Sequence, residues 1–270
     1  MMFKRFLALM VLTIVMTIGF WQSTLADTTV ENEQQAILVT GASSGIGRNI
    51  AETLAANGYF VYAGARKQAD LDALNEIPNI QSVRLDVTKQ EEIDAAVEIV
   101  RAGGKGLYGL VNNAGVLVVG PITEIDEDEL AWILDVNLMG VYRVTKAFAP
   151  LIIDSKGRIS NISSIAGILS GMFWAPYNMS THALESYTDD LSAEMSLFGV
   201  KVSAINPGNY KSRIGTKEAA ALAKKPYAQP GSVYAEHIAS DIEYMSDRSM
   251  YKDPDDVTAA VMHALFDPAP

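Results

Sequence analysis

The sequence of 270 residues contains no cysteine. Disulfide bonds, thiolate catalysis and cysteine-ligated zinc are therefore excluded. Only three histidines occur, His182, His237 and His263, and their spacing is unlike that of metal ligands, so we expect no metal site, although carboxylates alone can also hold a cation. Basic residues are scarce as well, with 21 against 32 acidic residues and a net charge of −11. Because nucleic-acid phosphates are bound by clustered cations, this balance argues against a nucleic-acid partner.

The first 26 residues differ in character from the rest of the chain. Lys4 and Arg5 precede an uncharged apolar run over 6–21. This order is typical of a cleaved signal peptide over 1–26, and a short signal-anchor shows it too; a buried first helix in a cytoplasmic protein is the alternative. The positive-inside rule predicts a chain that is exported or anchored, and that touches a membrane only through this segment if it stays uncleaved. The polar residues 27–35 are expected to form a linker.

From residue 36 onward, short apolar runs alternate with longer helical patterns. Strands separated by crossover helices indicate one doubly wound α/β (Rossmann) domain over 36–270, a three-layer sandwich with a mainly parallel sheet of six strands. We expect strands at 36–40, 60–65, 80–86, 107–112, 157–163 and 201–206. We expect helices at 45–57, 68–76, 90–102, 126–153 and 173–198.

A glycine-rich turn follows the first expected strand. Its glycines stand in a Gly-x-x-x-Gly-x-Gly pattern where a helix begins. Such a turn lets the backbone approach a pyrophosphate, and the helix dipole favours the negative charge. We therefore expect dinucleotide binding, although three glycines also fit an ordinary tight turn. The expected cofactor-binding residues of this turn are Gly41, Ser43, Ser44, Gly45, Ile46 and Gly47.

The end of the second strand indicates which dinucleotide binds. In many dinucleotide-binding domains an acidic residue here hydrogen-bonds the ribose of NAD. This chain has Ala65 at that position, followed by Arg66. Because a guanidinium suits the additional phosphate of NADP, we expect NADP as the cofactor, with NAD less favoured. A solvated loop is the alternative explanation for Arg66.

The glycine-rich pattern that begins at Thr40 resembles the first signature of the short-chain dehydrogenase/reductase family, and further signatures follow in the family's order over about 36–266. The sequence around these signatures is most similar to that of hydroxysteroid and retinol dehydrogenases. The resemblance implies that eight further residues contact the cofactor, namely Asp86, Val87, Asn113, Ala114, Gly115, Pro207, Gly208 and Ser212.

The resemblance also implies a group of residues that carries out chemistry. Ser164 would orient the substrate, Asn137 would support a proton-relay water, and Tyr177, 13 residues after Ser164, would be the acid/base and also touch the cofactor. A tyrosine can protonate a developing alkoxide if its pKa, ordinarily about 10, is lowered. The family's lysine, four residues after the tyrosine, is replaced by Thr181, which can hydrogen-bond a ribose but supplies no positive charge.

Two functions therefore remain open. The first is an NADP-dependent oxidoreductase that interconverts a secondary alcohol and a carbonyl on a small, apolar substrate, with activity weakened by Thr181. The second is a non-catalytic NADP-binding sensor or scaffold. His182 and Lys146 are substitutes to consider for the missing charge, but His182 is turned by about 100° around the helix, and Lys146 fits a solvated helix surface.

Residues 213–252 are expected to cover the substrate. Their aromatic and methionine side chains suit an apolar substrate, although ordinary core packing explains such residues equally well. These side chains are Tyr227, Tyr234, Met245 and Tyr251. The apolar segment 171–176 is expected at the entrance.

The end of the chain lacks the apolar run that would form the family's usual seventh strand, which indicates either a shortened or an incomplete C-terminus. Family members frequently pair through the two long helices, here 126–153 and 173–198. The resemblance therefore implies a homodimer or homotetramer.

Overall fold

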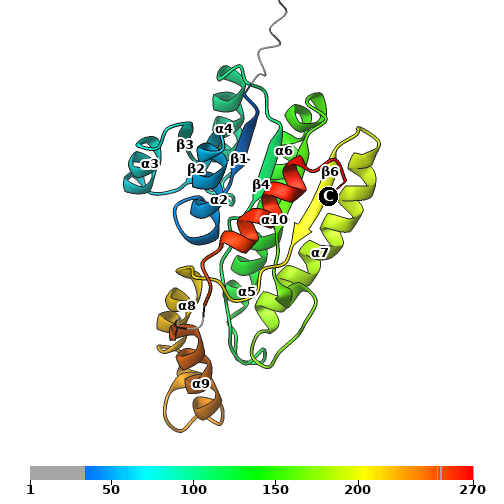
Figure 1. Ribbon diagram of the computed structural model, residues 1–270. Coiled ribbons are helices and arrows are strands. Elements are labelled where there is room, and N and C mark those ends of the chain that lie inside the picture. The colour runs from blue at the N-terminus through cyan, green and yellow to red at the C-terminus, as the bar shows by residue number, and fades with distance from the viewer. Residues whose placement is uncertain (1–33, 248, 250, 270) are drawn as a thin grey trace, which may run out of the picture. The chain divides into compact units, whose positions relative to one another are not determined.

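The computed structural model describes residues 34–247, 249 and 251–269 (Figure 1). These residues belong to one compact unit. The expected signal segment at 1–26 and most of the expected linker lie outside the described residues.

The described strands form one sheet of six parallel strands, as the alternating pattern predicts. The strands are β1 Ala36–Val39, β2 Phe60–Ala65, β3 Ile80–Arg84, β4 Gly109–Asn112, β5 Arg158–Ile162 and β6 Lys201–Ile205. Their order, β3-β2-β1-β4-β5-β6, reverses direction between β1 and β4. This is the doubly wound arrangement, in which ligands bind at the carboxyl ends of the strands near the reversal. The described residues contain no seventh strand.

Helices cover both faces of this sheet. The helical elements are α2 Gly45–Ala56, α3 Gln68–Asn75, α4 Gln90–Ala102, α5 Glu127–Leu134, η1 Asp135–Met139, α6 Gly140–Asp154, η2 Ile165–Gly167, α7 Ala175–Ser196, α8 Ile214–Leu222, η3 Pro226–Ala228, α9 Ala235–Ser246 and α10 Asp255–Phe266. One face packs on α2, α3 and α10, and the other on α4, α6 and α7. Helices α8 and α9 lie beside each other beyond the carboxyl ends of the strands (Figure 1).

The long helix expected at 126–153 contains a change of helical type. It continues from α5 through the π-helical turn η1 into α6. Asn137 lies in η1, where its Nδ2 donates to the Val116 carbonyl at 2.9 Å and its Oδ1 accepts from the Val116 amide at 2.8 Å. Single π turns inside α-helices occur often at functional sites. Here the turn brings Asn137 against the loop that follows β4.

The same helical run is long and apolar enough to cross a membrane, judged by length and composition alone. Val144, Phe148 and Ile152 are fully buried in the cluster on that face of the sheet. Packing against the sheet therefore accounts for the apolar character of the run.

A buried chain of amide and hydroxyl groups joins β4 and β5 to the helices on one face. Nδ2 of Asn112 donates to Oγ1 of Thr145 at 3.0 Å and to Oδ1 of Asn161 at 2.9 Å. Nδ2 of Asn161 donates in turn to Oγ1 of Thr188 at 2.9 Å. Because Thr145 lies in α6 and Thr188 in α7, the chain fixes both helices against strands that end at the cavity described below.

The Asn161→Ala variant should lower the free energy of unfolding by about 1–3 kcal/mol, because buried groups of Asn112 and Thr188 would lose their partner. Urea denaturation measures this change. The matched control is Ser160→Ala, since Ser160 is equally buried and its hydroxyl has no hydrogen-bond partner among the described residues. This control should leave stability unchanged or slightly raised, and equal losses in the two variants would contradict the assigned role of the network.

Candidate active site

A cavity of about 610 Å³ opens at the carboxyl ends of the strands. Among the residues predicted to be catalytic or to bind the cofactor, every one except Gly45 lines this cavity in the described structure. They are Gly41, Ser43, Ser44, Ile46, Gly47, Arg66, Asp86, Val87, Asn113, Ala114, Gly115, Asn137, Ser164, Tyr177, Thr181, Pro207, Gly208 and Ser212. The structure thus brings together residues that are up to 171 positions apart in the sequence (41 to 212).

The glycine-rich turn fits closely against the loop that follows β4. A Cβ atom on Gly47 would lie 2.2 Å from Nδ2 of Asn113, and one on Gly41 would lie 2.8 Å from Cα of Ala114. Nδ2 of Asn113 donates to the carbonyl of Thr40 at 2.9 Å. Gly45, with φ of +59°, lies against Ser212, whose Cβ would be 3.0 Å from an added Cβ. Side chains at these glycines would push the turn away from the loops that follow β4 and β6.

The first turn of α2 suits an anionic ligand. Ser44 is its N-cap, its side chain makes no capping hydrogen bond within the described residues, and the first turn carries no acidic side chain. The uncapped amide N–H groups and the dipole of α2 therefore favour a pyrophosphate at the cavity edge. This arrangement fits a nicotinamide dinucleotide, with Gly41 to Gly47 around its phosphates.

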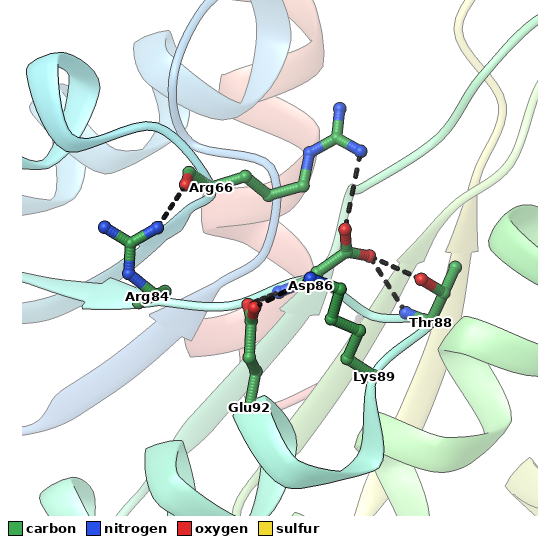
Figure 2. Close-up of polar contacts among 6 residues, drawn as sticks. All are labelled: Arg66, Arg84, Asp86, Thr88, Lys89 and Glu92. Atoms are coloured by element: carbon green, nitrogen blue, oxygen red, sulfur yellow. Dashed lines mark hydrogen bonds and ion pairs between the residues drawn. The ribbon is translucent and has the colours of Figure 1, made fainter.

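Figure 2 shows the surroundings of Arg66 and Asp86, which follow β2 and β3. Nη1 of Arg66 lies 3.7 Å from Oδ2 of Asp86, and the Arg66 side chain is 62% exposed. Thr88 donates to Oδ1 of Asp86 through its amide at 3.1 Å and its hydroxyl at 2.8 Å. Burial alone would raise the pKa of Asp86, but these hydrogen bonds and the charge of Arg66 hold it below its ordinary value. Asp86 is therefore ionised at neutral pH, while the exposed guanidinium stays accessible to a second anion.

Arg84 supports the turn that carries Arg66 (Figure 2). Its Nη1 donates to the carbonyl of Arg66 at 2.6 Å and its Nη2 to Oε1 of Gln68 at 2.8 Å. Arg84 fixes the backbone from which the Arg66 side chain extends. Sequence reasoning missed this residue because an arginine on an exposed strand position carries no motif.

Ser164 and Tyr177 meet at the other end of the cavity. Ser164 lies between the end of β5 and the start of η2, and its Oγ accepts from the amide of Ala166 at 3.1 Å. Tyr177 lies in the first turn of α7. Burial raises the pKa of Tyr177, and a hydrogen bond with Ser164 acts in the opposite direction without cancelling it. The hydroxyl of Tyr177 is therefore protonated at neutral pH, as a proton donor must be.

Asn137 and Thr181 are both held by hydrogen bonds to neighbouring groups. Nδ2 of Asn137 donates to Oγ of Ser180 at 3.1 Å, and Ser180 donates to the carbonyl of Tyr177 at 2.8 Å. Oγ1 of Thr181 lies 3.0 Å from the carbonyl of Tyr177 and 3.1 Å from that of Asn178, both within α7. The hydroxyl proton of Thr181 is therefore used inside its own helix, where a lysine would extend a charge into the cavity.

The two substitutes considered for the missing charge point elsewhere. His182 is exposed, and its Nδ1 lies 2.9 Å from the carbonyl of Asn178 in the same helix. Nζ of Lys146 lies 5.6 Å from the ring centroid of Tyr142 on the surface of α6. Neither residue belongs to the described cavity lining. Neither side chain therefore offsets the effect of burial on the pKa of Tyr177.

The substrate side of the cavity differs in part from the sequence expectation. Met245 and Tyr251 line it as expected, but Tyr227 and Tyr234 do not lie in the described lining and pack in the cluster between α8 and α9. The reason is that the folding of α8 onto α9 decides which aromatic side chains face inward. The lining also contains Trp174 from the expected entrance segment and Ile214, Lys217 and Tyr244 from the expected covering segment. Leu169 lines the cavity as well, although the sequence did not indicate it.

The described residues contain no group of three or more histidine, aspartate or glutamate side chains that could hold a metal ion.

Comparison with known proteins identifies the family. The family model described as short chain dehydrogenase matches residues 35–223. The mitochondrial D-beta-hydroxybutyrate dehydrogenase of Bos taurus is 36% identical over 86% of this chain and 73% of its own length. Retinol dehydrogenase 16 of Homo sapiens is 38% identical over 67% of this chain and 59% of its own length.

Solved structures agree with this match. A variant of the actinorhodin polyketide ketoreductase with NADPH has a TM-score of 0.73 at 30% identity, covering 87% of this chain and 92% of its own. A short chain dehydrogenase/reductase from Burkholderia phymatum in complex with NAD has a TM-score of 0.74 at 27% identity, covering 86% and 85%. The chain belongs to the short-chain dehydrogenase/reductase family of oxidoreductases.

Proposed function

We propose that the chain is an NADP-dependent oxidoreductase that interconverts a secondary alcohol and a carbonyl on a small, apolar substrate. The observation that carries this proposal is the hydrogen-bonded pair of Ser164 and Tyr177, placed in one cavity with the glycine-rich turn. Bound NADP would supply or accept the hydride. The chain's own groups would handle the oxygen of the substrate, with Ser164 holding it and Tyr177 passing its proton to the developing alkoxide.

The preference for NADP is supported by Arg66. The solved relatives do not decide the matter, because one holds NADPH and the other NAD. In this chain Ala65 removes the acidic side chain that would bind the ribose of NAD, and the exposed Arg66 is positioned by Arg84. The carboxylate of Asp86 is already paired with Arg66, which reduces its repulsion toward a bound phosphate.

The Arg66→Ala variant should raise the Kd for NADPH by about 10-fold or more, because a charge-assisted hydrogen bond contributes about 1.5–3 kcal/mol. The Kd for NADH should change little. Fluorescence titration of both cofactors measures the two values. The Lys67→Ala variant is the matched control, since it removes a cation from the same turn, and an equal loss of NADPH affinity there would contradict a specific role for Arg66.

Activity in this chain is proposed to be weak. Without a neighbouring cation, the partly buried Tyr177 is a poor proton acceptor for alcohol oxidation, because burial disfavours its ionised form. The second candidate function, a non-catalytic NADP-binding sensor or scaffold, is supported by this same substitution at Thr181. Turnover by the unmodified chain distinguishes the two.

The Thr181→Lys variant should accelerate alcohol oxidation at pH 7 by about 10-fold or more, because a nearby positive charge lowers the pKa of a phenol by about 1–3 units. A raised pKa in the unmodified chain means that its oxidation rate keeps climbing as pH increases, and the lysine variant should reach its plateau at lower pH. The pH profile of kcat measures both. Thr181→Met, which adds length without charge, should bring no gain, and a gain equal to that of lysine would contradict this electrostatic explanation.

An apolar substrate is supported by apolar side chains in the lining of the cavity. Leu117, Leu169, Trp174 and Met245 line it, and the exposed Ile168 lies next to this lining in the sequence. The relatives named above are a dehydrogenase of hydroxybutyrate and one of retinol, both of which are alcohols. We therefore propose a secondary alcohol or ketone with an apolar body.

The placement of the chain in the cell is proposed from its sequence alone. Residues 1–26 would export the chain or anchor it to a membrane, residues 27–35 would link them to the domain, and the domain would occupy 36–270, with 213–252 over the substrate. Sequencing of the mature N-terminus tests cleavage at the end of the segment, and an intact, water-extractable chain that begins at Met1 would contradict the proposal.

We also propose that the chain forms a homodimer or homotetramer through its long helices. Trp132, Met139 and Tyr142 are exposed apolar side chains on the run from α5 to α6, and Met179 is exposed on α7. Burial of such side chains stabilises subunit contacts. Sedimentation velocity should therefore give a dimer or tetramer at micromolar concentration, with dissociation in Trp132→Glu, and a monomer in the unmodified chain would contradict the proposal.

A further inference from the structure

We propose that Asp241 of α9 is a positioning residue for Tyr177, acting through the indole of Trp174. The inference rests on the proposed function, since it takes Tyr177 as the proton donor. Helix α9 would then help to determine the position of the Tyr177 hydroxyl in the cavity.

Trp174 is in direct contact with the helix turn that carries Tyr177. It is the N-cap residue of α7, and its carbonyl accepts from the amide of Asn178 at 2.8 Å. The rings of Trp174 and Tyr177 meet edge to face, with centroids 6.2 Å apart and planes at 70°. Both rings line the cavity. A rotation of the indole would therefore remove one wall against which the Tyr177 ring rests.

Asp241 holds this indole from the other side. Its side chain is hydrogen-bonded to the side chain of Trp174, whose only polar group is the indole N–H donor. The carboxylate is partly buried and lies on α9, a helix far along the chain. A hydrogen bond to a charged acceptor is stronger than a neutral one, so it can fix the ring orientation.

The backbone next to Trp174 shows that this segment is held under strain. Phe173 has a φ of +67°, which is unusual for a bulky residue without glycine's freedom. Its carbonyl accepts from the amide of Gly120 at 2.7 Å. Its ring meets Tyr234 edge to face at 5.8 Å and lies 6.2 Å from the ring of His237. Strained conformations persist only where their surroundings hold them, and part of that support comes from α9 and the residue before it.

These contacts connect three positions in series. Helix α9 holds Phe173 and Trp174, Trp174 contacts Tyr177, and Tyr177 is hydrogen-bonded with Ser164. Tyr177 also packs against the cluster shared by α8 and α9. Proton transfer is sensitive to distance, and a misplacement of about 1 Å can cost about 100-fold in rate. Helix α9 and Tyr177 are thus connected by a continuous series of side-chain contacts.

The test is a double-mutant cycle on carbonyl reduction at saturating NADPH. Asp241→Ala removes the acceptor, and Trp174→Phe keeps an aromatic ring but removes the N–H donor. Each should lower kcat by about 10- to 100-fold with the Kd for NADPH unchanged. The double variant should be no slower than the slower single variant, because both changes break one hydrogen bond. Asp241→Asn, which retains an oxygen acceptor, should recover most of the rate.

Two controls separate positioning from general destabilisation. Glu243→Ala removes an exposed carboxylate from the same helix and should leave kcat unchanged. In a Trp21→Phe, Trp132→Phe background, Trp174 is the one remaining tryptophan of the sequence, and its emission should shift in Asp241→Ala but not in Glu243→Ala.

Unchanged kcat in Asp241→Ala, or effects of the two single changes that multiply in the double variant, would overturn the inference while leaving the proposed function standing. A chain that binds NADPH but reduces no carbonyl, with or without Thr181→Lys, would overturn the proposed function and the inference together.

Discussion

The shared direction of the six strands is the constraint on which the site depends. Because all six run parallel, their carboxyl ends meet at one edge of the sheet. Each loop that follows a strand therefore opens toward the same cavity, whether it carries Gly41, Arg66, Asn113, Ser164 or Ser212. The buried amides of Asn112 and Asn161 hold two of these strands to α6 and α7, so the sheet edge and the helix that bears Tyr177 keep a fixed relation.

Much of this arrangement could be predicted from the sequence, because it depends on local chemistry. The alternation of apolar runs and helical patterns correctly indicates all six strands, and the glycines of the first turn indicate an anion-binding loop, whereas Ser164 and Tyr177 are indicated only by the family resemblance. What could not be predicted depends on contacts between distant elements. The apolar period continues through η1 without a signal of its π turn, and the inward side chains of α8 and α9 are selected only when the two helices pack. Arg84 and Asp241 act through hydrogen bonds to Arg66 and Trp174, which are 18 and 67 positions away (84 − 66 and 241 − 174), and no local pattern reveals such contacts.

Burial and the hydrogen bond with Ser164 act in opposite directions on the pKa of Tyr177, the proposed proton donor. Burial raises the pKa of Tyr177, so the proton to be donated is present, but the phenol is a weaker acid and the ionised form that alcohol oxidation requires is disfavoured. The family pattern that the sequence resembles has a lysine here, whose charge would lower the pKa of the tyrosine. In this chain the hydroxyl of Thr181 instead lies against the carbonyl of Tyr177 in the same helix. In the proposed mechanism, the residues that would hold the substrate oxygen are present while the positive charge is absent, so these two contributions to proton transfer would be separated in one molecule.

The π turn at η1 also restricts how the length of this chain can change. A π turn contains one residue more than the α-helical turn it interrupts. Deletion of a single residue within η1 can be absorbed by a return to the regular α-helical turn, so α6 would keep its face toward the sheet. Deletion of a residue between η1 and Phe148 has no such outlet, and it would rotate Phe148, now fully buried against the sheet, by about 100°. The π turn is thus the position in this long helix where the loss of one residue disturbs the buried face least.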